Sequence, residues 1–155
     1  MQWTYNNTPL TEIPESAIGF VYLIINTLTG KKYIGKKLFY ATKTKVKTIT
    51  LKTTGVKKKK KIKESIESDW KDYYGSSDYL KADVIAQGSE NFKREVLRLC
   101  YNKGELSYYE AKYQFECDVL IYPEIWYNSW ISVRVQRAHI KNLVNEKSGK
   151  YSGPL

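Results

Sequence analysis

Two short apolar runs separated by a polar turn stand near the start of the chain. The first run occupies residues 19–25 and reads Gly-Phe-Val-Tyr-Leu-Ile-Ile, and the second occupies 31–35 and reads Lys-Lys-Tyr-Ile-Gly. Residues 26–30 join them as Asn-Thr-Leu-Thr-Gly, a polar stretch that ends in glycine. Apolar, β-branched runs on either side of such a turn predict a β-hairpin over 19–35.

The predicted hairpin places two tyrosines side by side. If Ile25 pairs with Gly30 across a four-residue loop, Tyr22 lies directly opposite Tyr33. Residues opposed in this way on one face have Cβ atoms about 4.5–5.5 Å apart. Gly35 then ends the second strand, at a point where a backbone or a ligand can approach closely.

Downstream, the pattern predicts three helices and one more strand. Apolar residues recur at four-residue steps at Ile62, Ile66 and Trp70, and Ser77 is placed to cap a helix that Gly88 ends. The predicted helices cover 63–73, 78–87 and 105–120, and the predicted strand covers 91–100. Together with the hairpin, these elements predict an α/β fold class with a small, mainly antiparallel three-stranded sheet flanked by helices.

The predicted elements fit one domain bordered by less regular segments. Residues 1–17 hold two prolines and an Asn-Asn-Thr cluster and predict an irregular N-terminal arm. The domain is predicted over 18–136, and its last segment, 131–136, fits either a strand or the start of a helix. A basic insertion is expected at about 38–63, and the polar, basic tail 137–155 is expected to fray.

The insertion is rich in lysine and threonine. Residues 48–51 fit a short edge strand, but five adjacent lysines at 57–61 repel one another, which argues against an isolated helix or strand there. We therefore expect either a basic hairpin or a mobile loop. The candidate nucleic-acid-binding residues are Lys37, Lys45, Lys57, Lys58, Lys59, Lys60 and Lys61.

Composition narrows the choice of partner and compartment. The chain of 155 residues carries 26 Lys and Arg against 16 Asp and Glu, a formal net charge of +10 that suits a polyanion. Its two cysteines, Cys100 and Cys117, have no metal-ligand spacing, so a zinc site is not expected. The N-terminus lacks the features of a signal peptide, and no apolar run approaches the roughly 20 residues that span a bilayer. These features predict a cytoplasmic protein without a membrane partner.

The hairpin resembles the GIY-YIG nuclease signature. Phe20, Val21 and Tyr22 stand where that family has Gly-Ile-Tyr, and the sequence Tyr-Ile-Gly at 33–35 matches its second half letter for letter. The order hairpin, helix, strand, helix with a glutamate and later asparagine also matches, over about residues 19–130. Residues 68–77, Ser-Asp-Trp-Lys-Asp-Tyr-Tyr-Gly-Ser-Ser, look like phage-borne, homing endonuclease-like members. The resemblance implies a nuclease of a bacterial or phage-infected cell.

The resemblance implies a Mg²⁺-dependent site that hydrolyses DNA. Glu110 looks like the metal-binding carboxylate, and Asn128 like the family's later asparagine. Mg²⁺ often takes only one or two carboxylates, so one glutamate suffices, and Mn²⁺ is expected to substitute. Tyr22 is expected to act as a base only if nearby cations lower its pKa from about 10, with Tyr33 orienting the water. One site cuts one strand, so double-strand cleavage would need a homodimer or two successive events.

The sequence departs from the family at the cation that should hold the phosphate. The family has an arginine about ten residues after the second tyrosine, on a following helix, whereas this chain has Lys43 there and no arginine before Arg94. Lys43 has the right spacing if a helix follows the hairpin; Lys36 or Lys37 is nearer if the chain runs straight into the insertion. Lys45, Arg94 and Arg98 are further candidates. Lysine acts as a point charge and lacks the planar fork of arginine.

Two other functions compete with the nuclease. A non-catalytic DNA- or RNA-binding protein on the same scaffold is favoured by the missing arginine and opposed by Tyr22, Tyr33 and Glu110. A basic structural protein of a nucleoprotein particle would show no metal dependence. The only histidine, His139, lies in the tail, and no catalytic role is expected for it.

Overall fold

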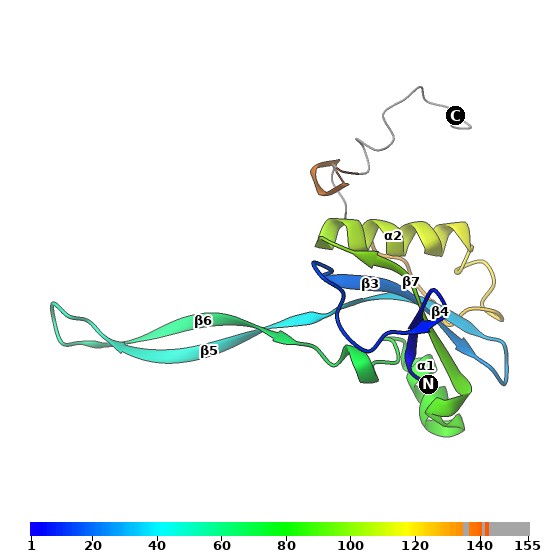
Figure 1. Ribbon diagram of the computed structural model, residues 1–155, viewed down its shortest axis with the longest axis horizontal. Helices are drawn as coiled ribbons and strands as arrows, with labels where there is room; N and C mark the ends of the chain where they lie inside the picture. The colour runs from blue at the N-terminus through cyan, green and yellow to red at the C-terminus, as the bar shows by residue number, and fades with distance from the viewer. Residues whose placement is uncertain (135–136, 141, 143–155) are drawn as a thin grey trace.

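A mixed five-stranded sheet forms the centre of the computed structural model, which describes residues 1–134, 137–140 and 142 (Figure 1). The strand order is β2-β1-β7-β3-β4. The bounds of these strands are Trp3–Tyr5 for β1, Thr8–Pro9 for β2, Gly19–Asn26 for β3, Lys32–Leu38 for β4 and Phe92–Cys100 for β7. The three antiparallel strands β7, β3 and β4 are those expected from the sequence, but the sheet is larger than predicted.

The N-terminal segment supplies the extra strands. β1 pairs in parallel with β7, and the Trp3 side chain is 1% exposed, with its ring at 5.0 Å from that of Phe20. The prediction of an irregular arm over 1–17 is therefore wrong for β1 and β2. Three-residue and two-residue strands are too short to give a recognisable alternation of apolar and polar positions. The division of the chain into arm, domain and tail stays a prediction.

The register of the β3–β4 hairpin differs by two residues from the predicted one. Ile25 pairs with Lys32, not with Gly30, so Tyr22 lies opposite Gly35. The hairpin instead closes through the Asn26 N–H, which donates to the Lys31 carbonyl, and the buried Asn26 side chain holds the turn, because its Oδ1 accepts hydrogen bonds from the backbone N–H groups of residues 28 and 29. Since side chains alternate with a period of two, an even shift keeps Tyr22 and Tyr33 on one face as diagonal neighbours.

The insertion forms a long two-stranded ribbon. β5 (Tyr40–Thr50) and β6 (Lys57–Glu67) pair over their whole length and project away from the sheet (Figure 1). The five adjacent lysines lie in β6, so their repulsion does not prevent a strand. The predicted helix over 63–73 is wrong, and only η1 (Trp70–Asp72) is helical there. The helix was predicted from apolar residues spaced by four. Four is also a multiple of two, so Ile62 and Ile66 share one face of a strand as well.

Two α-helices lie on opposite sides of the sheet. α1 (Asp78–Gln87) confirms the prediction over 78–87, and the Ser77 hydroxyl accepts the N–H of Leu80 as its cap. α2 (Lys103–Glu116) begins after Asn102 and ends four residues before the predicted end.

Short 3-10 turns are η2 (Ser89–Asn91) and η3 (Arg137–Ile140). Residues 131–134 form neither strand nor helix, and the rest of the 131–136 segment and most of the tail lie outside the described residues.

Each face of the sheet carries its own apolar cluster. Phe20, Tyr22 and Trp70 belong to the cluster on the face that α1 covers, and Val21, Ile34 and Leu106 belong to the cluster under α2. β4 therefore lies between two packed layers, and its outer edge is the place where groups from both layers can meet. Among the helices of the described residues, none has the length and apolar character needed to cross a bilayer.

Candidate active site

A cavity of about 360 Å³ opens along the outer edge of β4. Its lining includes Tyr33, Lys36, Ser76, Glu110, Asn128 and Trp130. Tyr33 and Lys36 come from β4 and Glu110 from α2, whereas Ser76 precedes α1 and the last two follow α2. Four predicted site residues, Tyr33, Lys36, Glu110 and Asn128, thus border one space although they are up to 95 positions apart in the chain.

Lys36 and Glu110 form an ion pair at this cavity. The Lys36 Nζ lies 3.0 Å from Glu110 Oε2 and donates a 3.0 Å hydrogen bond to Ser107 Oγ, one turn earlier on α2. Burial raises the pKa of Glu110 above its usual range, and the hydrogen bond from Lys36 opposes that rise. The Glu110 side chain keeps 15% of its surface exposed and the Lys36 side chain 36%, so both groups are accessible from the cavity.

The paired tyrosines lie behind and beside this ion pair. Tyr22 is fully buried, its ring centroid is 6.1 Å from that of Tyr33, and Gly35 leaves the space in which the Tyr22 phenol crosses β4. Gly35 thus does admit a close approach, but the approaching group is a side chain of the same hairpin. The Tyr33 hydroxyl shares a 2.8 Å hydrogen bond with Ser76 Oγ.

Neither phenol is activated as a base by the cations near it. Burial raises the pKa of Tyr22 well above its ordinary value of 10, with a smaller effect from Tyr73, and burial also raises the pKa of Tyr33. The neighbouring lysines by themselves therefore do not lower the pKa of Tyr22, and a base role that also depends on a bound metal ion stays a prediction. Lys37 turns instead toward Asp69 and lies 3.9 Å from the centre of the Tyr73 ring.

Asn128 holds the cavity edge of β4 in place. Its Oδ1 accepts the N–H of Ile34 at 3.1 Å, and its Nδ2 donates to the Ile34 carbonyl at 2.8 Å. Gln114 Nε2 donates to the same carbonyl at 3.0 Å. The Asn128 amide thus pairs with β4 as a neighbouring strand would, and it fixes the stretch of β4 between Tyr33 and Lys36.

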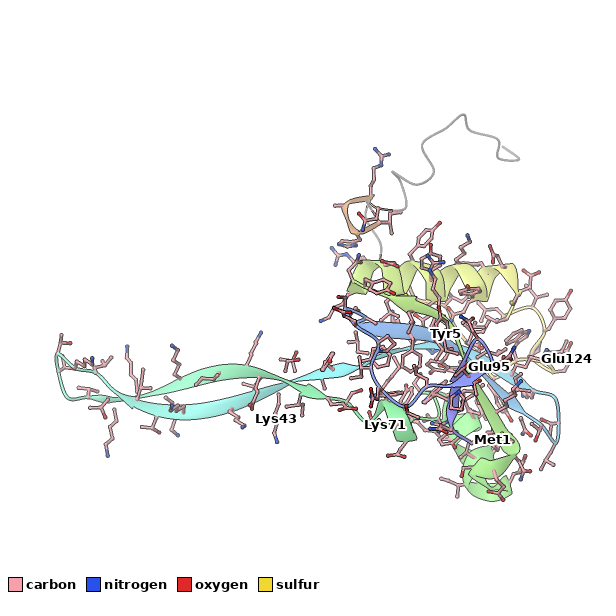
Figure 2. All side chains as sticks on the ribbon, viewed as in Figure 1. Met1, Tyr5, Lys43, Lys71, Glu95 and Glu124 are labelled. Carbon is pink, nitrogen blue, oxygen red and sulfur yellow. The ribbon has the colours of Figure 1, made fainter. Side chains whose placement is uncertain are left out.

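The other cations considered from the sequence lie elsewhere. Lys43, Lys45 and Lys57–Lys61 belong to the ribbon, and Figure 2 shows Lys43 out on its strand, because a strand and not a helix follows the hairpin. The structure therefore does not bring Lys43 to the site. Arg94 is 4% exposed and donates to the carbonyls of three residues, and Arg98 stacks at 3.7 Å over Tyr109. Of these candidates, Lys36 is the one that lines the cavity.

Seven residues that line the cavity were not among the predicted site residues, and three of them, Ser76, Gln114 and Trp130, illustrate why. Ser76 bonds Tyr33, Gln114 supports β4, and Trp130 lines the cavity with 70% of its surface exposed. Ser76 lies in the 68–77 segment that carries part of the resemblance, which was the available signal for it. Gln114 lies one helical turn after Glu110, so helical spacing could have predicted that both residues share one face of the helix. Trp130 had no such signal.

The oxygen groups that line the cavity would suit Mg²⁺ better than a transition metal. Glu110 is the one acidic residue in its lining, and no cluster of three or more His, Cys, Asp or Glu occurs among the described residues. Serine hydroxyls and an amide oxygen are the other oxygen groups at the wall. Mg²⁺ prefers oxygen ligands, often binds through one or two carboxylates, and keeps several waters.

Comparison with known families places this mixed α/β domain in a nuclease-type class. The chain is a member of the GIY-YIG family: the family model described as "Putative endonuclease segE, GIY-YIG domain" matches residues 3–131. The matched region begins at Trp3, the first residue of β1, and so includes both short N-terminal strands. No curated protein and no solved structure gives a match.

Proposed function

We propose that the protein is an endonuclease that hydrolyses phosphodiester bonds in DNA at the β4 cavity. The observation that carries this proposal is the meeting of Tyr33, Lys36 and Glu110 at one cavity in a chain of a nuclease-type family. Glu110 would hold Mg²⁺, or Mn²⁺ in its place, and the ion would neutralise charge on the phosphate and on the leaving oxygen. The substrate is double-stranded DNA, and two chains acting together would be needed to cut both strands at once.

Lys36 takes the role of the missing arginine. An ammonium has three N–H donors, and Glu110 and Ser107 account for two of them. When DNA enters, the Lys36 ammonium exchanges the Glu110 carboxylate for an oxygen of the scissile phosphate, which frees that carboxylate for its ligand role. Ser107 keeps the lysine side chain directed toward the cavity during this exchange.

The tyrosines position the reacting water and do not take its proton. Both phenols have raised pKa values and stay protonated at neutral pH. Of these two phenols, the Tyr33 hydroxyl, which Ser76 orients, is the one at the cavity, where it can hold a water by hydrogen bonding. Tyr22 supports Tyr33 from behind through ring packing.

Plasmid nicking in Mg²⁺ and in EDTA tests this function. Wild-type protein should nick in Mg²⁺ or Mn²⁺ and lose the activity in EDTA. Glu110→Gln and Lys36→Ala should each reduce the single-turnover rate at saturating protein by about 10²–10³, the range for removing one charge-stabilising group. Glu116→Gln and Lys112→Ala are matched controls, because these two residues pair with each other on the same helix and do not line the cavity. Undiminished cleavage in EDTA would refute the metal dependence.

A non-catalytic DNA- or RNA-binding function is the second candidate, and the ion pair itself favours it. Lys36 neutralises the one carboxylate of the cavity, as expected if that carboxylate serves only packing. This function predicts wild-type affinity for DNA, no nicking in either metal, and no effect of Glu110→Gln beyond stability.

A further inference from the structure

The ribbon of β5 and β6, residues 40–67, carries most of the net charge of the protein. It contains ten lysines and two glutamates, a formal charge of +8 out of +10 for the whole chain. From here on, we call this segment, residues 40–67, the arm; it is distinct from the N-terminal arm expected over residues 1–17. In Figure 2 the lysine side chains project from the arm on both sides, far from the apolar clusters of the sheet.

The arm has no partner within the described residues that would account for it. Every residue of β5 and β6 is exposed except Ile49, which is partly buried. A two-stranded ribbon on its own is marginally stable in water, and like charges directly opposite destabilise it further. Lys47 lies directly opposite Lys60. An anionic partner along the arm would weaken the mutual repulsion of its ten lysines.

The two faces of the arm differ in chemistry. On one face, Thr44, Val46, Thr48 and Thr50 of β5 lie opposite Lys63, Lys61, Lys59 and Lys57 of β6. We call it the threonine–lysine face; it presents a row of ammonium groups beside a row of mainly hydroxyl side chains. The opposite face also carries lysines, at positions 43, 45, 47, 58 and 60, but Ile49, Ile62 and Ile66 stand among them, and Glu64 pairs there with Lys45 at 2.7 Å. The two faces therefore differ little in charge, and the threonine–lysine face is distinguished by the short hydrogen-bonding groups that lie beside its lysines where the opposite face has isoleucines.

We propose that the arm binds in the major groove of double-stranded DNA through its threonine–lysine face. This inference rests on the proposed function for the choice of DNA as the polyanion. The B-DNA major groove, about 12 Å wide, admits a two-stranded β-ribbon. Eleven residues at about 3.4 Å each span about 37 Å, close to one turn of B-DNA at about 34–36 Å. Lysine and threonine side chains bond both phosphates and base edges.

The base of the arm is fixed to the candidate active site. The Ser68 N–H and hydroxyl bond the carbonyls of Phe39 and Leu38, at 2.8 and 2.7 Å, and close the ribbon where it leaves β4. Phe39 and Trp70 pack at 5.1 Å between ring centres. β4 then leads from the arm to Lys36 and Tyr33. DNA held by the arm is therefore held at a set position relative to the cavity.

Two variants with equal charge changes on opposite faces test the proposal. One changes Lys57, Lys59, Lys61 and Lys63 to Gln; the other changes Lys45, Lys47, Lys58 and Lys60 to Gln. Affinity is measured in EDTA by fluorescence anisotropy on a labelled duplex of about 30 bp, or three helical turns. The first variant should bind at least about tenfold more weakly than the second, and its salt slope should fall by about three to four units. Thermal melting confirms that both variants fold.

Three results would overturn the proposal. Equal losses in the two variants would mean that the arm acts as an unoriented polycation. Equal affinity for a duplex RNA of the same sequence would exclude the major groove, because in A-form RNA that groove is too deep and narrow for side chains to read. Unchanged affinity after replacing 42–65 by an Asn-Gly turn between Ala41 and Ile66, which face each other, would show that the arm does not bind.

The same assays separate this inference from the proposed function. The first lysine variant should need more protein for half-maximal nicking, by the same factor by which its dissociation constant for DNA rises, since its residues bind DNA but do not line the cavity. Glu110→Gln should keep the wild-type affinity and lose nicking. A wild-type protein that binds through one face of the arm but never nicks would refute the nuclease and support the arm.

Discussion

Replacing Gly35 by alanine tests whether the close packing of the two tyrosines on β4 matters for stability and function. A Cβ at this position would lie 2.6 Å from Cζ of Tyr22 and 2.9 Å from Cε1 of Tyr33, and closer still to the Tyr22 hydroxyl. The Tyr22 ring has no room to retreat, because it is 0% exposed, and the Tyr33 ring can shift only toward the cavity that it lines. Overpacking of a filled core lowers the free energy of unfolding by about 1–3 kcal/mol. Three contacts below 3.0 Å put this change at the upper end, about 3 kcal/mol.

The expected result is a free energy of unfolding lower by about 3 kcal/mol and a Tm lower by about 6–12 °C for a chain of this size. Urea unfolding measures the first and thermal melting the second. The saturating nicking rate should also fall, because the displaced side chain is that of Tyr33 at the cavity.

Gly30→Ala is the matched control in the same hairpin. Its Cβ would meet nothing within 4 Å, but its φ of +78° is strained for alanine and costs about 1 kcal/mol. It should lose this stability and keep the nicking rate. Adding Tyr22→Phe to Gly35→Ala removes the nearest clashing atom, so the double variant should be more stable than the sum of the single changes predicts. A Gly35→Ala protein as stable as wild type, or strictly additive effects, would refute the steric reasoning.

Two further predictions concern groups outside the cavity. Arg94→Met should lower the free energy of unfolding by about 2–4 kcal/mol in urea, because three backbone carbonyls lose their donor, while DNA affinity stays unchanged. With a thiol reagent, native protein should modify Cys117 and spare Cys100, because burial raises the pKa of Cys100 to about 12 and its side chain is fully covered; equal labelling of both cysteines in peptide mapping would contradict this.

Local signals in the sequence were sufficient for the central elements. The hairpin, α1 and β7 follow from turn residues, a cap at Ser77 and a stop at Gly88, all of which act within a few residues. The register of the hairpin could not be predicted from these local signals, because the position of the turn depends on the buried Asn26 side chain, which bonds back to the loop. Because the error was an even number of residues, the face shared by Tyr22 and Tyr33 was still predicted correctly.

Long-range pairing decided the elements that the sequence did not reveal. β1 is a strand because β7 offers it a parallel edge and Trp3 fills a space above Phe20, and neither condition is visible in the first five residues. The lysines of β6 form a strand because β5 supplies their backbone partners, which outweighs their mutual repulsion in water. The choice of the phosphate-binding lysine also depended on long-range pairing, since the element that follows the hairpin determines which lysine reaches the cavity.

The arm and the choice of lysine are linked by the course of the chain after β4. In the family pattern, the phosphate-binding arginine stands on a helix about ten residues after the second tyrosine. Here that stretch is the start of the arm, which leads away from the cavity, so no side chain from it can serve (Figure 1). The cation must then come from an element that stays at the cavity, and Lys36 of β4 meets this condition. If Lys36 binds the phosphate as proposed, it does so as a point charge with little geometric selectivity, and the site itself would select its substrate weakly. The same insertion that moves position 43 away from the site supplies the eleven paired positions of the arm, along which we propose that DNA binds.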